Sequence, residues 1–317
     1  MAETSTMTAS RPATGVARSG SRRVARVRNG PAGALLTVPA LLIFSVFTLL
    51  PTLYTFFISL FNWNPLNVSQ STFIGFDNYQ KLFGASKPSL LSSGLTSLYF
   101  TAGMVIGGSA ISLAIALLLQ RGGKVLAGVR LAVFVPHATP LVATSIVWVW
   151  IFNPQFGLAN AALHLFGIHS VEWLNSSTWA MPSVLIYSLW HEVGFTVVVF
   201  LGGLTLISPE LSEAAQLDGA NKWQEFRSVT WPQLRPVTLF VIVITTITSL
   251  QAFTQFYLMT RGGPVYATTT LSFLLYQEAF VFFHTGYAAA LAVVLFAVTA
   301  LFTLVQLGTS RSSRGAA

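Results

Sequence analysis

Six stretches of this sequence are long and apolar enough to cross a lipid bilayer. A transmembrane helix needs about 20 predominantly apolar residues. The six stretches run over residues 33–61, 97–120, 131–152, 179–206, 237–259 and 287–308. Only 8% of the 317 residues are charged, whereas soluble domains usually carry about 25%. We therefore predict an all-α integral membrane protein with six transmembrane helices.

The positive charges predict how these helices are oriented. If the N-terminus is cytoplasmic, fourteen of the 17 Lys and Arg residues lie on the inner side of the membrane. The outer loops then hold only Lys81, Lys87 and Arg261. Basic residues concentrate in cytoplasmic loops, so we expect both termini inside. The net charge of +8 is thus explained by membrane topology and anionic lipid, and we expect no nucleic-acid partner.

Composition divides the chain into three parts. Residues 1–30 are rich in Ser, Thr, Ala and Arg without an apolar run, which predicts a disordered basic cytoplasmic tail. Residues 31–310 form the six-span domain, and residues 311–317 form a second cytoplasmic tail. The absence of cysteine excludes disulfides and cysteine-ligated metals.

Residues 208–236 are the longest patch that mixes acidic and basic side chains. A charged segment of this kind cannot lie in hydrocarbon, so it must emerge into water between the fourth and fifth spans. Ser208 and Pro209 predict the N-cap and first turn of a helix, and Gly219 predicts its end because glycine tolerates positive φ.

A second short helix is expected after this break. Lys222–Arg227 predicts a turn or two, with Trp223 and Phe226 three residues apart on one apolar edge. Pro232 and Pro236 predict that no helix continues until the fifth span begins. An amphipathic helix pair of this size suits a groove on a partner protein.

The spacing within this loop carries a family resemblance. The residues that carry it are Glu213, Ala214, Ala215, Gly219, Val229, Trp231 and Pro232. They resemble the EAA loop of bacterial ATP-binding-cassette (ABC) importer permeases, with Val229 and Trp231 in place of the usual isoleucine and leucine. Both replacements keep an apolar residue, and the spacing matches throughout.

Other segments are similar to the carbohydrate branch of these permeases, of the maltose and glycerol-phosphate types. They include residues 73–79, 153–160, 260–271 and 276–288. The resemblance implies the type I importer permease (MetI-like) fold in the bacterial cytoplasmic membrane. It also implies three kinds of partner: a second, homologous permease, two ATP-binding subunits and an extracytoplasmic solute-binding protein. The chain contains no GxxxxGK[ST] motif, so ATP and Mg²⁺ are expected on the partner ATPases.

The resemblance assigns the ATPase-coupling role to the charged loop. The expected coupling residues are Glu213, Ala214, Ala215, Asp218, Gly219, Trp223, Phe226 and Pro232. In this interpretation Glu213 braces the loop, Gly219 permits the turn, and the two aromatic residues form the docked surface.

Four polar residues within the predicted spans are candidates for the solute path. Glu192 is the only acidic residue placed within a span, and such residues rarely face lipid. Thr248, Gln251 and Gln255 are spaced to share one helix face. Their side chains could bind sugar hydroxyls or hold helices together, and Glu192 could equally form an ion pair within the bundle.

The histidines do not indicate a metal site. His137 could be a ligand or a proton carrier, but a histidine near a proline and a membrane boundary is more often a satisfied polar residue. His164 and His169 lack a metal-like cluster, and no metal ligand is predicted. His191 and Glu192 are adjacent on one helix, where side chains point to different faces. This pair therefore predicts no catalytic dyad, and no catalytic residue is expected.

The predicted function is solute import by alternating access, driven by separate ATPases. The expected cargo is a carbohydrate or a glycerol-3-phosphate or glycerophosphodiester type of solute. The alternatives are an ion-coupled secondary transporter, which should show inverted repeats and broken helices, and, less favoured, a membrane-embedded enzyme, which should show clustered acid–base residues.

Overall fold

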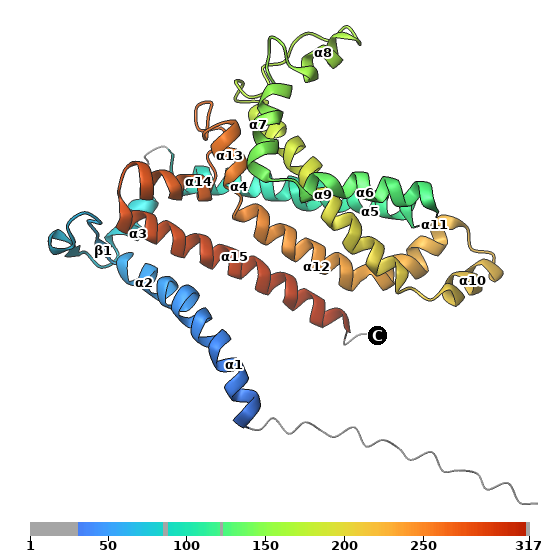
Figure 1. Ribbon diagram of the computed structural model, residues 1–317, viewed down its shortest axis with the longest axis horizontal. Coiled ribbons are helices and arrows are strands. Elements are labelled where there is room, and N and C mark those ends of the chain that lie inside the picture. Colours follow the sequence, from blue (N-terminus) through green and yellow to red (C-terminus); the bar gives the residue numbers. More distant parts are fainter. Residues whose placement is uncertain (1–30, 85–87, 121–122, 315–317) are drawn as a thin grey trace, which may run out of the picture. The chain divides into compact units, whose positions relative to one another are not determined.

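The computed structural model describes residues 31–84, 88–120 and 123–314 (Figure 1). It divides the chain into two units, residues 1–51 and residues 52–317. The predicted basic tail of residues 1–30 lies outside the described residues, as do residues 315–317 of the predicted C-terminal tail.

The first apolar stretch is helical. Its helices are α1 (Pro31–Phe44), a π-helical turn η1 (Ser45–Leu49) and α2 (Leu50–Ile58). Residues Thr37–Ile58 form one candidate span with a mean hydropathy of 2.1. The π turn lies directly before Pro51, where the ring of a proline disturbs the regular helix.

Four further helical stretches of the described chain are long and apolar enough to cross a membrane. They are α4–η3–α5 (Leu90–Gly103, Met104–Gly108, Ser109–Leu119), α9 (Ala180–Thr205), α11–η4–α12 (Lys222–Glu225, Phe226–Thr230, Trp231–Leu250) and α15 (Thr285–Arg314). These long helices run side by side (Figure 1). Together with the first stretch and one bent pair, they account for the six predicted spans.

The third span is broken, whereas the sequence predicted one continuous helix over residues 131–152. It consists of α6 (Lys124–Ala138) and α7 (Leu141–Ile151), which meet at an angle of 98°. The bend lies at Thr139, whose ψ of 149° is extended. A residue that precedes proline is pushed out of the helical region, so Pro140 explains the break.

The fifth span begins earlier and ends earlier than predicted. The helix is continuous from Lys222 to Leu250, so the expectation that Pro232 and Pro236 interrupt it is wrong. Pro232 lies in the first turn of α12, directly after the π-helical turn η4. After Leu250 the chain turns and starts a separate helix, α13 (Thr254–Met259).

Short elements cover the end of the bundle that lies opposite α10 and α11 (Figure 1). Strands β1 (Phe61–Asn62) and β2 (Thr72–Phe73) pair antiparallel, with Phe61 opposite Phe73. The other short elements there are η2 (Val68–Gln70), α3 (Asp77–Leu82), α14 (Leu271–Tyr276) and η5 (Gln277–Val281). Helix α8 (Leu158–His164) lies elsewhere, beyond α7 (Figure 1).

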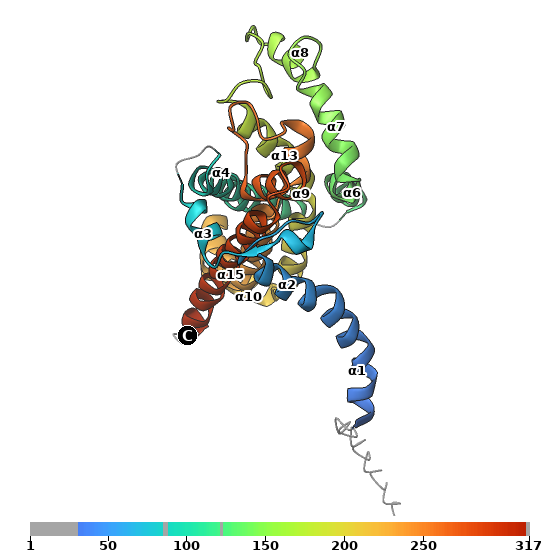
Figure 2. The same cartoon turned by 90° about the vertical axis from the view of Figure 1, so that its left-hand side faces the viewer.

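Helix α9 is the centre of the packing. Figure 2, which looks along the long helices, places it between α4 and α6. Its buried residues Val184 and Tyr187 join Phe100 and Phe256 in one core cluster, while Val197 belongs to a second cluster. Gly103 lets α4 pack closely against α9, because a Cβ there would lie 2.6 Å from the side chain of Leu185.

Candidate functional site

One cavity brings together all four residues that the sequence placed on the solute path. It has a volume of about 210 Å³ and is lined by residues that include Glu192, Thr248, Gln251 and Gln255. A neighbouring cavity of about 230 Å³ shares Glu192 and Thr248 and adds Thr245 and His137. The four candidate residues for the solute path thus line one cavity. The spacing along a single helix, from which three of them were chosen, does not explain how they come together.

The three residues of the fifth stretch do not share a helix face. Thr248 lies in the last turn of α12, Gln251 caps its C-terminus with φ −94° and ψ 3°, and Gln255 lies in α13. They meet because the chain reverses after Leu250. The end of the helix thus places polar groups of the backbone and of side chains at the cavity. Non-helical backbone within a membrane protein is tolerated where it lines a cavity in this way.

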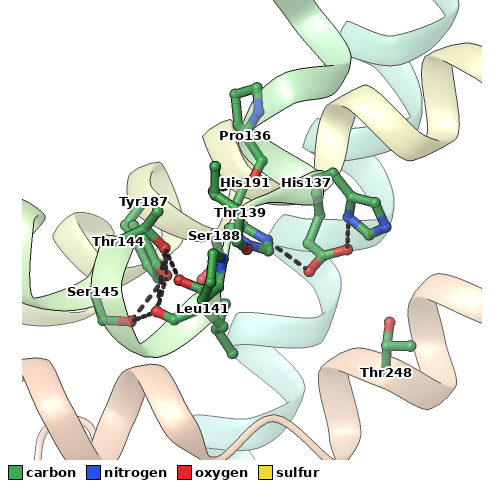
Figure 3. A network of polar contacts seen from close by, with 12 residues as sticks. Pro136, His137, Thr139, Leu141, Thr144, Ser145, Tyr187, Ser188, His191 and Thr248 are labelled. Carbon is green, nitrogen blue, oxygen red and sulfur yellow. Dashed lines mark hydrogen bonds and ion pairs between the residues drawn. The ribbon is translucent and has the colours of Figure 1, made fainter.

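Glu192 lies within ion-pair distance of two histidines, His137 and His191, which Figure 3 labels. Its Oε1 atom lies 3.1 Å from Nδ1 of His191, and its Oε2 atom lies 3.4 Å from Nδ1 of His137. The expectation that the side chains of His191 and Glu192 point to different faces is therefore wrong, because both approach the C-terminal end of α6. The approach of His137 to Glu192 depends on the packing of α6 on α9.

The three side chains have the composition of a metal-binding group. Ligand atoms of His137, His191 and Glu192 all lie within 4.8 Å of one another. The sequence predicted no metal ligand, and the grouping of these atoms alone does not test that prediction. His191 is buried, whereas His137 and Glu192 are half-buried.

A hydroxyl cluster fixes the start of α7 next to this group (Figure 3). The hydroxyl of Tyr187 donates to the carbonyl of Leu141 at 3.0 Å. It lies 2.9 Å from the hydroxyls of Thr144 and Ser145. Tyr187 is fully buried, so α9 holds α7 in its bent position by polar contacts in a dry environment.

The charged loop forms the predicted helix, break and second helix. Helix α10 (Pro209–Leu217) begins at Pro209 with Ser208 at its N-cap, as expected. The Ser208 hydroxyl, however, bonds to the carboxylate of Glu210 at 3.1 Å and does not cap the helix backbone.

The glycine of the EAA loop ends α10 in a Schellman motif. The Gly219 N–H donates to the carbonyl of Gln216 at 3.0 Å, and the Ala220 N–H donates to that of Ala215 at 2.9 Å. Gly219 has φ +83°, the left-handed conformation that this motif needs. The spacing between Ala215 and Gly219 is therefore the spacing of a helix stop.

Glu225 is the residue that braces the loop. Its carboxylate lies 3.0 Å from Nζ of Lys222 and 3.4 Å from the side-chain amide of Gln216, so it joins α11 to α10. The side chain of Glu213 is exposed and makes no hydrogen bond or ion pair within the described chain. The expectation that Glu213 braces the loop thus finds no contact within the described chain that supports it, and it stays a prediction.

The loop exposes large apolar side chains. Leu217 is 89% exposed and Trp223 is 68% exposed. Trp223 stacks on Phe226 with ring centroids 5.6 Å apart, which gives the predicted apolar edge. Exposed apolar residues grouped on a charged loop mark a protein contact.

Two residues in the other segments used for the resemblance have structural roles. Asn160 is buried and makes four hydrogen bonds, to the backbone of Pro154 and Val171 and to the indole of Trp173. A Cβ on Gly286 would lie 2.0 Å from the carbonyl oxygen of Phe61. These positions hold the outer loops in place.

Comparison with known proteins agrees with these features. Residues 108–313 match the family described as binding-protein-dependent transport system inner membrane component. The chain is 32% identical over 278 residues to the sulfoquinovosyl glycerol transport system permease protein SmoG of Agrobacterium fabrum, covering 88% of this chain and 90% of that protein. It is 30% identical over 292 residues to the trehalose/maltose transport system permease protein MalF of Thermococcus litoralis, covering 91% and 97%.

A solved structure shares the fold. It is a bacterial alginate ABC transporter in complex with an alginate pentasaccharide-bound periplasmic protein. The TM-score is 0.78 at 24% identity, covering 90% of this chain and 95% of the other. The predicted type I permease (MetI-like) fold is thereby confirmed.

Proposed function

The chain belongs to the family of binding-protein-dependent transport system inner membrane components, and from this membership we infer that it is the permease subunit of an ABC importer for a carbohydrate. The observation that carries this inference is the α10–α11 loop between two membrane spans. It is a rigid helix pair with exposed apolar side chains, as a docking site for a soluble motor requires.

The chemistry of the cavities favours a hydroxyl-rich solute. Within the described chain, the polar residues that line the two cavities are Gln, Thr, Ser, one Glu and two His, without Lys or Arg. Carboxylate and amide groups bind hydroxyls well, whereas a phosphate needs basic donors. We therefore favour a carbohydrate over a glycerol-3-phosphate or glycerophosphodiester type of solute. The names of the two relatives, a sulfoquinovosyl glycerol and a trehalose/maltose permease, support this choice.

Import proceeds by alternating access in this proposal. A second, homologous permease completes the pore, a solute-binding protein delivers cargo outside, and two ATP-binding subunits hold ATP and Mg²⁺ inside. The coupling residues are Glu213, Ala214, Ala215, Asp218, Gly219, Trp223, Phe226 and Pro232, to which we add Leu217. Closure of the ATPases moves this loop as a rigid body. The free energy that drives this movement comes from the difference in contacts between the inward-open and outward-open states.

The proposed orientation places both termini and the α10–α11 loop in the bacterial cytoplasm. Several helix ends lie toward the same end of the long helices (Figure 1): the C-terminal end of α5, the N-terminal end of α6, the α10–α11 pair and the C-terminal end of α15. This agrees with the distribution of Lys and Arg, because these are the segments that the sequence assigns to the inner side.

The permease itself performs no chemistry in this proposal. The broken third span is a feature that ion-coupled transporters also use, so dependence on the ATPases is the property that separates the two mechanisms. Uptake by the reconstituted permease pair without ATPases would contradict the proposal.

A charge placed on the loop tests the docking surface. We expect Leu217→Asp to abolish co-purification with the ATPase subunits and to reduce ATP-driven uptake at least ~10-fold, because an unpaired charge would be buried at the interface. The matched control is Leu66→Asp, since Leu66 is 88% exposed but lies in the first outer loop. Equal assembly of both variants with the ATPases would show that the loop is not the docking site.

A further inference from the structure

His191 has a defined tautomer in this structure. Its Nε2 atom lies 3.3 Å from the carbonyl oxygen of Thr139. A carbonyl can only accept a hydrogen bond, so Nε2 carries the hydrogen. In the neutral ring, the lone pair of Nδ1 then points at Oε1 of Glu192, 3.1 Å away.

His137 approaches the same carboxylate. Its Nδ1 atom is buried and has no hydrogen-bond partner among the described residues, yet it lies 3.4 Å from Oε2 of Glu192. Two imidazole nitrogens therefore converge on one carboxylate. An imidazole nitrogen that faces a carboxylate either carries a proton or binds a cation together with it.

We propose that His137, His191 and Glu192 form a binding site for one divalent transition-metal ion, with zinc as the best match. Two imidazole nitrogens and one carboxylate are a known zinc ligand set that leaves a coordination position open. The ligand atoms lie within 4.8 Å of one another, whereas two ligand atoms at the zinc distances of ~2.0–2.2 Å lie about 3.5 Å apart in a tetrahedral site. Side-chain rotations that shorten the longest separation by about 1 Å would therefore enclose the ion.

The surroundings fit a ligated metal. The Nε2–H of His191 donates to Thr139, and metal-bound histidines commonly donate their other N–H to a backbone carbonyl, which orients the ring. The open position would face the cavity lined by Thr245 and Thr248, where a water molecule could complete the coordination.

Such an ion would connect two elements. His137 lies on α6 just before the 98° bend, whereas His191 and Glu192 lie on α9. A metal bound by all three would tie the bend to the central helix. The metal site needs no motor or partner protein, but it shares Glu192 with the proposed solute path. Zinc binding is measured without transport, so its failure would leave the proposed import function untouched.

The test is metal binding by the purified full-length chain in detergent, with an affinity tag free of histidine and with metals stripped by a chelator. We expect one Zn²⁺ per chain by titration calorimetry. Substituted Co²⁺ should give visible absorption bands typical of nitrogen and oxygen ligation in a site of low coordination number. The Co²⁺ spectrum of the unmodified chain needs no variant, so it remains informative if a variant fails to fold.

Variants identify the ligands. His137→Gln should weaken zinc binding at least ~10-fold and change the Co²⁺ spectrum, because it removes one of three ligands. The matched control is His284→Gln, since His284 lies 2.8 Å from the carboxylate of Glu278 in a pair without a third ligand. We expect this control to bind zinc as the unmodified chain does.

Two results would overturn the proposal. One is the absence of stoichiometric zinc binding at micromolar concentrations, in which case the cation shared by the three groups is a proton. The other is equal zinc affinity of His137→Gln and the unmodified chain, which would place the ion elsewhere.

Discussion

At the scale of single residues, Gly194 determines how closely α6 approaches α9. A Cβ at this position would lie 2.3 Å from the carbonyl oxygen of Val133 and 2.9 Å from Cα of Phe134. Both contacts are with backbone, which cannot move aside as a side chain can. The position of His137 on α6, and therefore its contact with Glu192, depends on this close approach.

We predict that Gly194→Ala destabilises the protein by ~1–3 kcal/mol, the usual cost of overpacking a tight contact. Thermal unfolding of the purified chain would show a lower midpoint. Gly202→Ala is the control on the same helix, because nothing lies within 4 Å of a Cβ there. The control should be neutral or slightly stabilised, since alanine favours helix over glycine. Equal midpoints for the two variants would contradict the proposed close contact.

At the scale of elements, the α10–α11 pair owes its shape to local hydrogen bonds. A Schellman motif ends α10 at Gly219. A capping box then starts α11, with Gln224 N–H donating to the Asn221 side chain at 3.0 Å and Asn221 N–H donating to the Gln224 side chain at 2.8 Å. The angle between the helices is thus set by residues adjacent in sequence, which suits a loop that moves as one body.

We predict that Gly219→Val uncouples ATP hydrolysis from uptake, whereas Gly219→Asn largely preserves coupling. The physical reason is the φ of +83° at this position, which asparagine tolerates and a β-branched residue does not. The measurement is the ratio of solute imported to ATP hydrolysed in proteoliposomes. No atom lies within 4 Å of a Cβ at Gly219, so a difference in coupling between Gly219→Val and Gly219→Asn would not come from a clash at the Cβ atom. Normal coupling in Gly219→Val would show that the loop needs no such turn.

At the scale of the whole molecule, the distribution of basic residues predicts which end of the bundle faces the cytoplasm. The sequence contains no cysteine, so single cysteines can be introduced without background labelling. We predict that Leu66→Cys reacts with a membrane-impermeant thiol reagent in intact cells, whereas Lys222→Cys reacts only after the membrane is permeabilised. Both side chains are exposed, so accessibility within the protein does not confuse the comparison. The reverse pattern would place the α10–α11 loop outside and remove its access to an ATPase.

Features that depend on short stretches of sequence were predictable. The spans follow from hydropathy, because each apolar stretch must meet lipid wherever the bundle places it. The stop at Gly219 follows from backbone geometry that neighbouring residues satisfy. Two local effects of proline were nevertheless predicted wrongly. Pro140 breaks the third span, while Pro232 does not interrupt the fifth because a π-helical turn precedes it.

Features that depend on residues far apart in the chain were not predictable in detail. Glu192 and Gln255 line the same cavity because α12 ends at Leu250 and the chain turns there. The prediction that Thr248, Gln251 and Gln255 share one helix face was therefore wrong, although all three residues line the cavity. The meeting of His137 with Glu192 requires a glycine contact between α6 and α9.

The sequence by itself therefore determined the membrane class, the number of spans and the helix, stop and second helix of the charged loop, because hydrophobicity and helix capping act over a few residues. Only the tertiary structure decided the bend of the third span against α9, the polar cavity and the convergence of two histidines on one carboxylate. Those arise from packing between helices, where a single close backbone approach positions side chains more than fifty residues apart in the chain.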